Sequence, residues 1–322
     1  MDFSLLGLIR NLSILGKLVV GVLLLLIIAS VIGGILSAKV TGEKGRATVA
    51  NLNSRIRAWW VMVAIFGVAI GTGGIGSIVL FFLMSFLAMR EFMTLTPTAK
   101  TDHAALFWAF FIFAPIQYLL VWMQWYGLFA VFIPVYGFVA ITSRMALSGD
   151  TSRFLERTAS VQWGVMACVY CISHAPALLM LQVPSYAGSG ATLLFYLVLI
   201  VQLNDVMQYV WGKLFGRHPV APAVSPNKTW EGFIGGTLTS VVVGAALYWA
   251  TPFSPLVAGV MSLAITLLGF AGGLVMSAIK RDRGVKDYGT LIQGHGGVLD
   301  RLDSLLFAAP VFFHLIRFFY VP

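Results

Sequence analysis

The run LVVGVLLLLIIASVIGGIL, residues 18–36, decides the fold class of this chain. It contains no charged residue, and about 20 apolar residues are enough for a helix to cross the hydrocarbon core of a membrane. The run is longer than the apolar core of a signal peptide and lacks a convincing small-residue cleavage site. The sequence therefore predicts a membrane helix that is retained in the mature protein.

Similar apolar runs recur along the whole chain. Of its 322 residues, 59% are hydrophobic and only 10% are charged, whereas about 25% of a soluble domain is charged. The runs are continuous rather than alternating, which disfavours a β-barrel and predicts an all-α, polytopic helical membrane protein. The net charge of +9 does not imply nucleic-acid binding, because basic loops at membrane ends are the ordinary result of the positive-inside rule.

About ten transmembrane helices are predicted from these runs. The second and third come from one long apolar stretch, which we divide at Gly71–Gly74 because a glycine cluster favours a tight turn. One long tilted helix is the alternative, and it would invert the sidedness of the later segments. The predicted spans are residues 18–38, 58–72, 76–94, 104–121, 125–143, 159–182, 190–211, 233–250, 256–279 and 304–321.

Ten spans assign each loop to one of the two sides of the membrane, and the Lys and Arg residues are divided unequally between these sides. Of the 21 Lys and Arg residues, all but Arg10, Lys17 and Arg317 fall on one side. The positive-inside rule assigns the charged loops to the cytoplasm. Two spans separate the loop at 212–232 from the loop at 280–303, so both loops are predicted to share the cytoplasmic face and to build one site.

The segment SAIKRDRGVKDYGTLIQGHGGVLDRLD, residues 277–303, interleaves five cations with four aspartates. Membrane anchoring explains lysines and arginines but not aspartates, so a ligand is expected. Asp300 and Asp303 are three residues apart, which on a helix turns both carboxylates toward one point and suits a divalent cation, whereas Arg301 points elsewhere and could contact phosphate. The glycines around His295 allow backbone amides to approach an anion closely.

A second polar segment covers residues 204–232 and ends in the run SPNKTWEG. Asp205 is a carboxylate inside a span, which makes it a functional candidate. Pro226 favours an extended approach to the next span, and Thr229 is predicted to cap that helix, whose first amides would favour a phosphate. Lys213 belongs to a small basic turn suited to an anionic head group. Ordinary interfacial anchoring is the alternative for these cations and tryptophans.

Other candidate residues have simpler interpretations. Cys168 and Cys171 form a C-x-x-C, but they lie in an apolar helix without a second Cys pair, so they are interpreted as packing residues. His174 is a lone polar group in a span and is expected to make a structural hydrogen bond. Arg90 and Glu91 end a span on the cytoplasmic side and could pair with each other.

The two polar segments resemble the phosphatidate cytidylyltransferases, also called CDP-diacylglycerol synthases. The family signature S-x-hydrophobic-K-R-x4-K-D-x-small-x2-hydrophobic-[PG]-x-H-G-G-hydrophobic-x-D-R-hydrophobic-D aligns with Ser277 to Asp303. The upstream pattern D-x-x-A-Y…G-[KR]…S-P-x-K-[ST]-x-E-G aligns with Asp205 to Gly232. A match of this length is very specific, and it covers roughly residues 200–305.

Three positions depart from the family pattern. Gln293 stands where the family usually has Pro or Gly, and Gln208 replaces a small residue. Many members read G-D-L-x-x-S before K-R, and that Asp looks like a metal ligand, but this chain has Gly273 there. Either one metal site is altered, or Asp205, Asp282 or Gln208 compensates. The chain thus resembles a divergent branch of the family.

The resemblance implies that CTP reacts with phosphatidic acid to give CDP-diacylglycerol and pyrophosphate, with Mg²⁺ as cofactor and a second cation as an open alternative. The implied metal ligands are Asp300, Asp303, Asp205 and Ser277. The implied catalytic residues are Lys280, Arg281, Lys286, Asp287 and Arg301. The implied substrate-binding residues are Ser225, Asn227, Lys228, Lys213, His295, Gly296 and Gly297.

The chain is interpreted as one integral membrane unit of the inner membrane. Residues 1–189 would form a scaffold with lipid access, and residues 190–322 would carry the catalytic loops. The expected partners are CTP, phosphatidic acid and membrane lipids, without nucleic acid; a homodimer is compatible with the resemblance. The alternatives are cytidylyl transfer to an isoprenoid or ether-lipid phosphate and, less favoured because the charges crowd one face, a membrane transporter.

Overall fold

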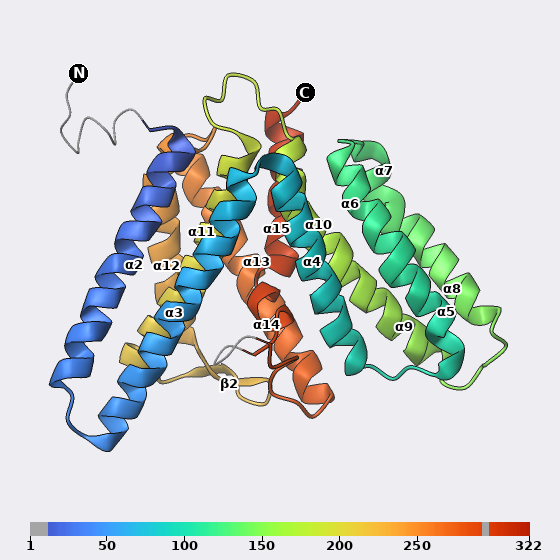
Figure 1. The fold of residues 1–322 in the computed structure, drawn as a ribbon, viewed down its shortest axis with the longest axis horizontal. Coiled ribbons are helices and arrows are strands. Elements are labelled where there is room, and N and C mark those ends of the chain that lie inside the picture. The colour runs from blue at the N-terminus through green and yellow to red at the C-terminus, as the bar shows by residue number, and fades with distance from the viewer. Residues whose placement is uncertain (1–11, 292–295) are drawn as a thin grey trace.

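Long helices joined by short connections make up the chain in this computed structural model, which describes residues 12–291 and 296–322 (Figure 1). The first three helices are α2 (Ile14–Lys39), α3 (Glu43–Gly71) and α4 (Gly73–Thr94). The next three helical runs are segmented by 3₁₀ and π turns into η1 (Lys100–Asp102), α5 (His103–Trp108), η2 (Ala109–Phe113), α6 (Ala114–Trp122), α7 (Tyr126–Val131), η3 (Phe132–Gly137), α8 (Phe138–Ala146), α9 (Phe154–Val165), η4 (Met166–Cys171), α10 (Ile172–Ala177) and η5 (Leu178–Met180). The remaining elements are α11 (Gly190–Phe215), β1 (Pro219–Ala221), β2 (Ser225–Thr229), α12 (Trp230–Ala246), η6 (Tyr248–Ala250), α13 (Pro255–Asp282), α14 (Leu299–Leu302) and α15 (Leu305–Tyr320).

The predicted fold class, an all-α polytopic membrane protein, is confirmed. In the described part of the chain, 8 helices or continuous helical runs are long and apolar enough to cross a membrane. The eighth and tenth predicted spans correspond to α12, with 17 residues, and α15, with 16 residues, which are shorter. The count of ten spans therefore stays a prediction.

The glycine cluster divides the second and third predicted spans as expected. Helix α3 ends at Gly71 and α4 begins at Gly73. Gly73 has a φ of 84°, a left-handed conformation that costs a glycine little and strains other residues. The alternative of one long tilted helix is therefore wrong.

The helix that contains the second predicted span is longer than that span, because α3 begins at Glu43 and the span was predicted to begin at residue 58. The polar stretch 43–57 stays helical because it packs along α2. Its Asn53 amide nitrogen donates hydrogen bonds to the Ser37 hydroxyl at 2.8 Å and to the Gly33 carbonyl at 3.4 Å. The span boundary was predicted from the start of an apolar run. In the polar stretch before it, hydrogen bonds to α2 take the place of apolar contacts.

The five segments predicted to share one side do lie at one end of the molecule. Figure 1 shows the α2–α3, α4–α5, α8–α9, α11–β1 and α13–α14 connections at the end opposite the C-terminus and the start of α2. The hairpin of α12 and α13 therefore returns the chain to the end that it left after α11. The two polar segments meet there.

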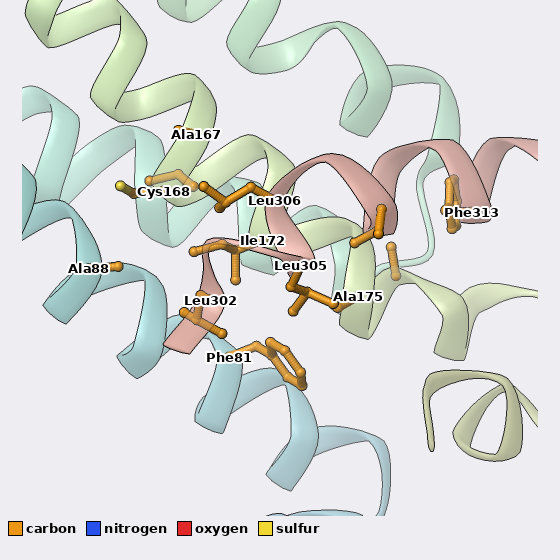
Figure 2. Close-up of a cluster of buried hydrophobic side chains, with 14 of the residues drawn as sticks. Phe81, Ala88, Ala167, Cys168, Ile172, Ala175, Leu302, Leu305, Leu306 and Phe313 are labelled. Carbon is orange, nitrogen blue, oxygen red and sulfur yellow. The ribbon is translucent and has the colours of Figure 1, made fainter. Parts of the chain in front are cut away.

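A buried apolar cluster fixes α14 and α15 against the N-terminal helices (Figure 2). Leu302 and Leu306 belong to one buried cluster with Phe81 of α4 and Ile172 of α10, and all four side chains are buried. Cys168 belongs to the same cluster, and both cysteines are free thiols, in agreement with the packing interpretation. Because α14 carries Asp300 and Arg301, this cluster sets the position of the polar site.

A buried ion cluster joins α9 to η1 at the same end of the molecule as the polar segments. The Arg157 guanidinium lies 3.3 Å from the Asp102 carboxylate and 2.6 Å from the Asp150 carboxylate. The side chains of Arg157 and Asp102 are 5% and 0% exposed, so neither charge has water as a substitute partner.

The variant Arg157→Met is expected to lower the free energy of unfolding by about 3 kcal/mol, because it leaves the buried Asp102 carboxylate without its cation. Thermal unfolding of the detergent-purified protein measures this change. Arg153→Met is the matched control, since Arg153 pairs with Glu156 on the surface and such pairs contribute little. Equal unfolding temperatures for the two variants would contradict the expectation.

Candidate functional site

A polar cleft of about 320 Å³ lies between α11, β2, the start of α12 and α14. It is set below the end of the molecule, because Asp205 precedes the last residue of α11 by ten positions, or about 15 Å of helix. Seven of the predicted site residues line it: Asp205, Ser225, Asn227, Lys228, Asp300, Arg301 and Asp303. The prediction that two distant segments build one site is thus consistent with the structure.

Both oxygens of the Asp300 carboxylate accept hydrogen bonds from other residues of the chain. Oδ1 accepts a hydrogen bond from the Lys280 ammonium at 2.8 Å, and the two side chains are only 3% and 11% exposed. Oδ2 accepts the backbone amides of Tyr288 at 2.8 Å and Gly297 at 2.9 Å. Asp300 therefore ties the end of α13 to the loop before α14, and its predicted role as a metal ligand stays a prediction.

The glycines of the loop make room for the carboxylates of this chain. Gly296 has a φ of 80°, and a Cβ added there would lie 2.7 Å from Oδ2 of Asp300. A Cβ at Gly297 would collide with the Glu91 carboxylate. We expected these glycines to admit the anion of a ligand, and the anions they admit here are Asp300 and Glu91. His295 lies outside the described residues.

Glu91 is a positioning residue that the sequence reasoning missed. Its carboxylate accepts the amide of Val298 at 3.0 Å and that of Leu299 at 2.9 Å, where α14 begins. The sequence left a pairing with Arg90 open, and the structure shows contacts to a segment about 200 residues later. The sequence did contain one sign of this role, because Glu91 places a carboxylate in the last turn of a helix. The helix dipole disfavours negative charge there unless hydrogen-bond donors compensate it.

Asp205 and Asp303 form the second carboxylate group of the cleft. The Ser304 hydroxyl donates to Asp205 at 2.9 Å, and the Ser304 amide donates to Asp303 at 2.7 Å. Burial raises the pKa of the Asp303 carboxyl above its ordinary value of 3.8, although the Lys228 ammonium acts against this shift. Burial likewise lowers the pKa of Lys228 below 10.5, opposed by the same two carboxylates.

Lys228 occupies the space that a side chain at position 273 would need. A Cβ added to Gly273 would lie 2.8 Å from the Lys228 ammonium and 3.9 Å from the Asp303 carboxylate. The ammonium also lies 4.9 Å from the ring centre of Phe270.

Three residues were considered as replacements for the carboxylate that is missing at Gly273. Asp205 and Gln208 line the cleft, whereas Asp282 pairs with Arg283 at 3.2 Å.

The carboxylates suit Mg²⁺ only if other ligands complete the site. In residues 12–291 and 296–322, no three His, Cys, Asp or Glu side chains come together as a metal site. Asp205 and Asp303 nevertheless offer hard oxygen ligands within one cleft. Mg²⁺ is commonly bound by one or two carboxylates together with water and substrate phosphates, so this donor pair fits a metal that arrives with a phosphate ligand.

Lys213 and Ser277 are among the predicted site residues that do not line the cleft. Lys213 is exposed, and its ammonium lies 6.0 Å from the ring centre of Tyr209. The Ser277 hydroxyl donates to the Gly273 carbonyl at 2.7 Å, within α13. The structure thus gives each of them a local contact, and their predicted ligand roles stay predictions.

The basic turn after α13 also stands apart from the cleft. Arg281 donates to the Val224 carbonyl at 3.3 Å, which ties the end of α13 to the turn between the two strands. Lys286 and Asp287 are exposed in the loop that follows. None of these three residues lines the cleft, and their predicted catalytic roles stay predictions.

The run SPNKTWEG adopts the predicted extended and capped form. Ser225–Thr229 is strand β2, which pairs antiparallel with β1 through the partners Pro219 and Thr229. The Thr229 hydroxyl accepts the Gly232 amide at 3.1 Å and so caps α12. Thr229 and Gly232 both line the cleft, which directs the positive end of the α12 dipole into it.

Comparison with known proteins gives three findings. Residues 53–319 match the pattern described as "Cytidylyltransferase family". A protein named "Uncharacterized protein YnbB" from Escherichia coli (strain K12) is 42% identical over 298 residues, which cover 91% of this chain and 95% of that protein. The phosphatidate cytidylyltransferases of Mycobacterium leprae (strain TN) and Staphylococcus aureus (strain COL) are 40% and 44% identical over 173 and 127 residues.

The last two matches cover only part of each chain. They span 52% and 38% of this chain, and 53% and 48% of those relatives. The chain therefore aligns with about half the length of the two phosphatidate cytidylyltransferases, and with nearly the full length of the Escherichia coli relative.

Glu91→Ala is expected to speed hydrogen exchange at the Val298 and Leu299 amides about tenfold or more, because a hydrogen bond to a charged group contributes about 1.5–3 kcal/mol. Exchange followed by mass spectrometry on the detergent-purified protein measures this. Glu43→Ala, at an exposed position in the first turn of α3, should leave the same amides unchanged. Unaltered exchange in Glu91→Ala would refute the positioning role.

Gly273→Asp is expected to strengthen Mn²⁺ binding about tenfold, because it adds a third carboxylate beside Asp205 and Asp303 while the flexible Lys228 side chain moves aside. Electron paramagnetic resonance titration with Mn²⁺ gives the affinity. Ala278→Asp, exposed on the same helix, adds the same charge away from the cleft. An unchanged affinity in Gly273→Asp, or an equal gain in the control, would show that the cleft carboxylates do not bind the ion.

Proposed function

Because the chain belongs to the cytidylyltransferase family, we propose that it transfers the cytidylyl group of CTP to phosphatidic acid, forming CDP-diacylglycerol and releasing pyrophosphate. The observation that carries this proposal is that Asp205, Lys228, Arg301 and Asp303, drawn from two polar segments, line one cleft. The partial matches to phosphatidate cytidylyltransferases support the choice of acceptor.

The reaction asks the protein chiefly to position two anions. An oxygen of the lipid phosphate attacks the α-phosphorus of CTP, and the bond to the β-phosphate oxygen breaks, so that pyrophosphate leaves. The attacking oxygen is already negatively charged, so no strong base is needed. Catalysis then depends on holding the two phosphates in line and on neutralising charge as the bond breaks.

The residues of the cleft can supply much of this neutralisation. Lys228 and the start of α12 present positive charge from one wall, and Arg301 presents it from another. Arg301 has a further property that suits a phosphate ligand: its Nε is buried and makes no hydrogen bond to any described residue. A guanidinium in this state favours a bidentate anion.

The charge balance of the cleft favours a divalent cation. Three carboxylates, Asp205, Asp300 and Asp303, line it against two cations, Lys228 and Arg301, so a triphosphate would meet no excess of positive charge. Asp205 and Asp303 would hold Mg²⁺ together with the phosphates. When bound there, the ion would supply electrostatic stabilisation of the triphosphate.

The finer assignments belong to this proposal as well. The end of the molecule that carries the cleft would face the cytoplasm, where CTP is available, because nearly all cations gather at that end. An isoprenoid or ether-lipid phosphate is the alternative acceptor, since Lys228 and Arg301 would contact the phosphate rather than the group esterified to it. The homodimer stays a prediction. A transporter is disfavoured because the cleft charges gather at one end of the molecule.

Asp303→Asn and Asp205→Asn are each expected to reduce cytidylyl transfer about a hundredfold or more while leaving membrane insertion intact, because each removes a charge that acts on the reacting phosphates. The assay uses radiolabelled CTP, Mg²⁺ and a panel of phosphatidate, isoprenoid phosphate and ether-lipid phosphate on purified protein. Asp282→Asn, outside the cleft, is the matched control. Asp303→Asn activity within a few-fold of the parent would overturn the assignment.

Asp300→Asn separates positioning from direct participation. Since Asp300 holds Lys280 and two backbone amides, its loss is expected to lower both the transfer rate and the unfolding temperature. Asp303→Asn should lower only the rate. A normal unfolding temperature in an inactive Asp300→Asn protein would instead favour the metal-ligand role predicted from sequence.

A further inference from the structure

An apolar groove of about 250 Å³ runs between α3, α4 and α11 and ends at α14. Its walls include Met62 and Phe66 of α3, Phe81 and Met84 of α4, and Val201 of α11. The polar side chains among its lining residues are Gln202 and Arg301. The groove is therefore chemically unlike the neighbouring cleft, although the two lie side by side.

The groove continues toward the N-terminal helix. A second apolar hollow of about 160 Å³ lies between α2, α3 and α11. The two hollows share five lining residues: Trp59, Val63, Phe66, Val198 and Gln202. Val19 and Val22 of α2 form the far wall, so the combined path leads from α14 across α3 and α11 to α2.

Arg301 connects this path to the polar cleft, because it lines both. Its Nε atom is buried, with no hydrogen-bond partner in the part of the chain that the structure describes. A buried donor without a partner is costly, and for a guanidinium the natural partner is an anion. One ligand satisfies both surroundings at once: an anionic phosphate ester whose apolar tail extends along the groove.

We propose that this groove binds an acyl chain of the lipid phosphate acceptor, that Arg301 holds its phosphate, and that α2 sets the length of chain accepted. The proposal rests on the proposed function, since it takes the acceptor to be a lipid phosphate. It goes further in assigning a role to α2, which lies outside the residues 53–319 matched by the family pattern.

Selectivity for acyl chains of one length has to come from the shape of the groove. A tail that leaves the bilayer for the groove exchanges one apolar environment for another, so burial itself provides little discrimination. What α2 can provide is a boundary: a long chain reaches Val19 and Val22, and a short chain does not. Hydrogen bonds from Asn53 to Ser37 and from Trp60 to Ser30 hold α2 against α3, so this boundary is fixed.

The test fills the far end of the groove. Val22→Trp is expected to lower kcat/KM for dioleoyl phosphatidate at least tenfold and to change that for dihexanoyl phosphatidate less than twofold. Leu25→Trp places the same bulk on α2 at a residue that is itself 61% exposed. This control variant should alter kcat/KM for neither lipid. Equal losses for both lipids, no loss for the long chain, or the same loss in Leu25→Trp would overturn the proposal.

A readout without turnover separates this inference from the proposed function. Phosphatidate with a diazirine at the end of one acyl chain is photolysed with the protein in nanodiscs, and labelled residues are identified by mass spectrometry. Labels are expected on α2 and on the groove side chains Trp59 and Phe66, and they should fall at least fivefold in Arg301→Gln but not in Arg283→Gln. A diacylglycerol probe, which lacks the phosphate, should label the groove weakly.

The outcomes are distinguishable. Groove labelling in a protein that transfers no cytidylyl group would end the proposed function and retain the lipid-phosphate groove. Active protein whose labels spread over exposed faces, or whose groove takes diacylglycerol equally well, would end the inference and retain the activity.

Discussion

The bond between the Lys280 ammonium and the Asp300 carboxylate is the contact on which the rest of the site depends. It is almost fully buried, at 11% and 3% exposure, and the same carboxylate also holds two backbone amides. Breaking such a pair strands a charge in low dielectric. With the Glu91 carboxylate holding the start of α14, it fixes Arg301 and Asp303, which no other described ion pair restrains.

The sequence was most informative where apolar residues form long runs and where charged residues cluster. Continuous apolar runs predicted the helices, and the glycines at 71–74 predicted the break between α3 and α4. The two polar segments were predicted to meet, because a membrane hairpin must return the chain to the end it left. Thr229 was predicted as a cap from its place before an apolar run, and the structure shows that cap.

Contacts between distant residues were beyond such reasoning. Glu91 lies 207 positions before Val298, and no local pattern links the two. The helical state of residues 43–57 was not predicted, because this stretch is polar and its Asn53 bonds to α2. Arg301 was expected to point away from the two aspartates, yet it lines the cleft with them. The identity of a charge can be read from sequence, but the direction it faces depends on packing.

Arg301 stands where a polar cleft and an apolar groove meet, so the site borders two hollows of different polarity. The polar cleft is lined by β2 and the start of α12, and the apolar groove between α3, α4 and α11 meets it at Arg301. Under the proposed function, the nucleotide would occupy the polar cleft and the lipid tail the apolar groove, so neither would obstruct the other. The kinetic order of substrate binding would then be random, and the water-soluble and membrane-bound products would depart by separate routes.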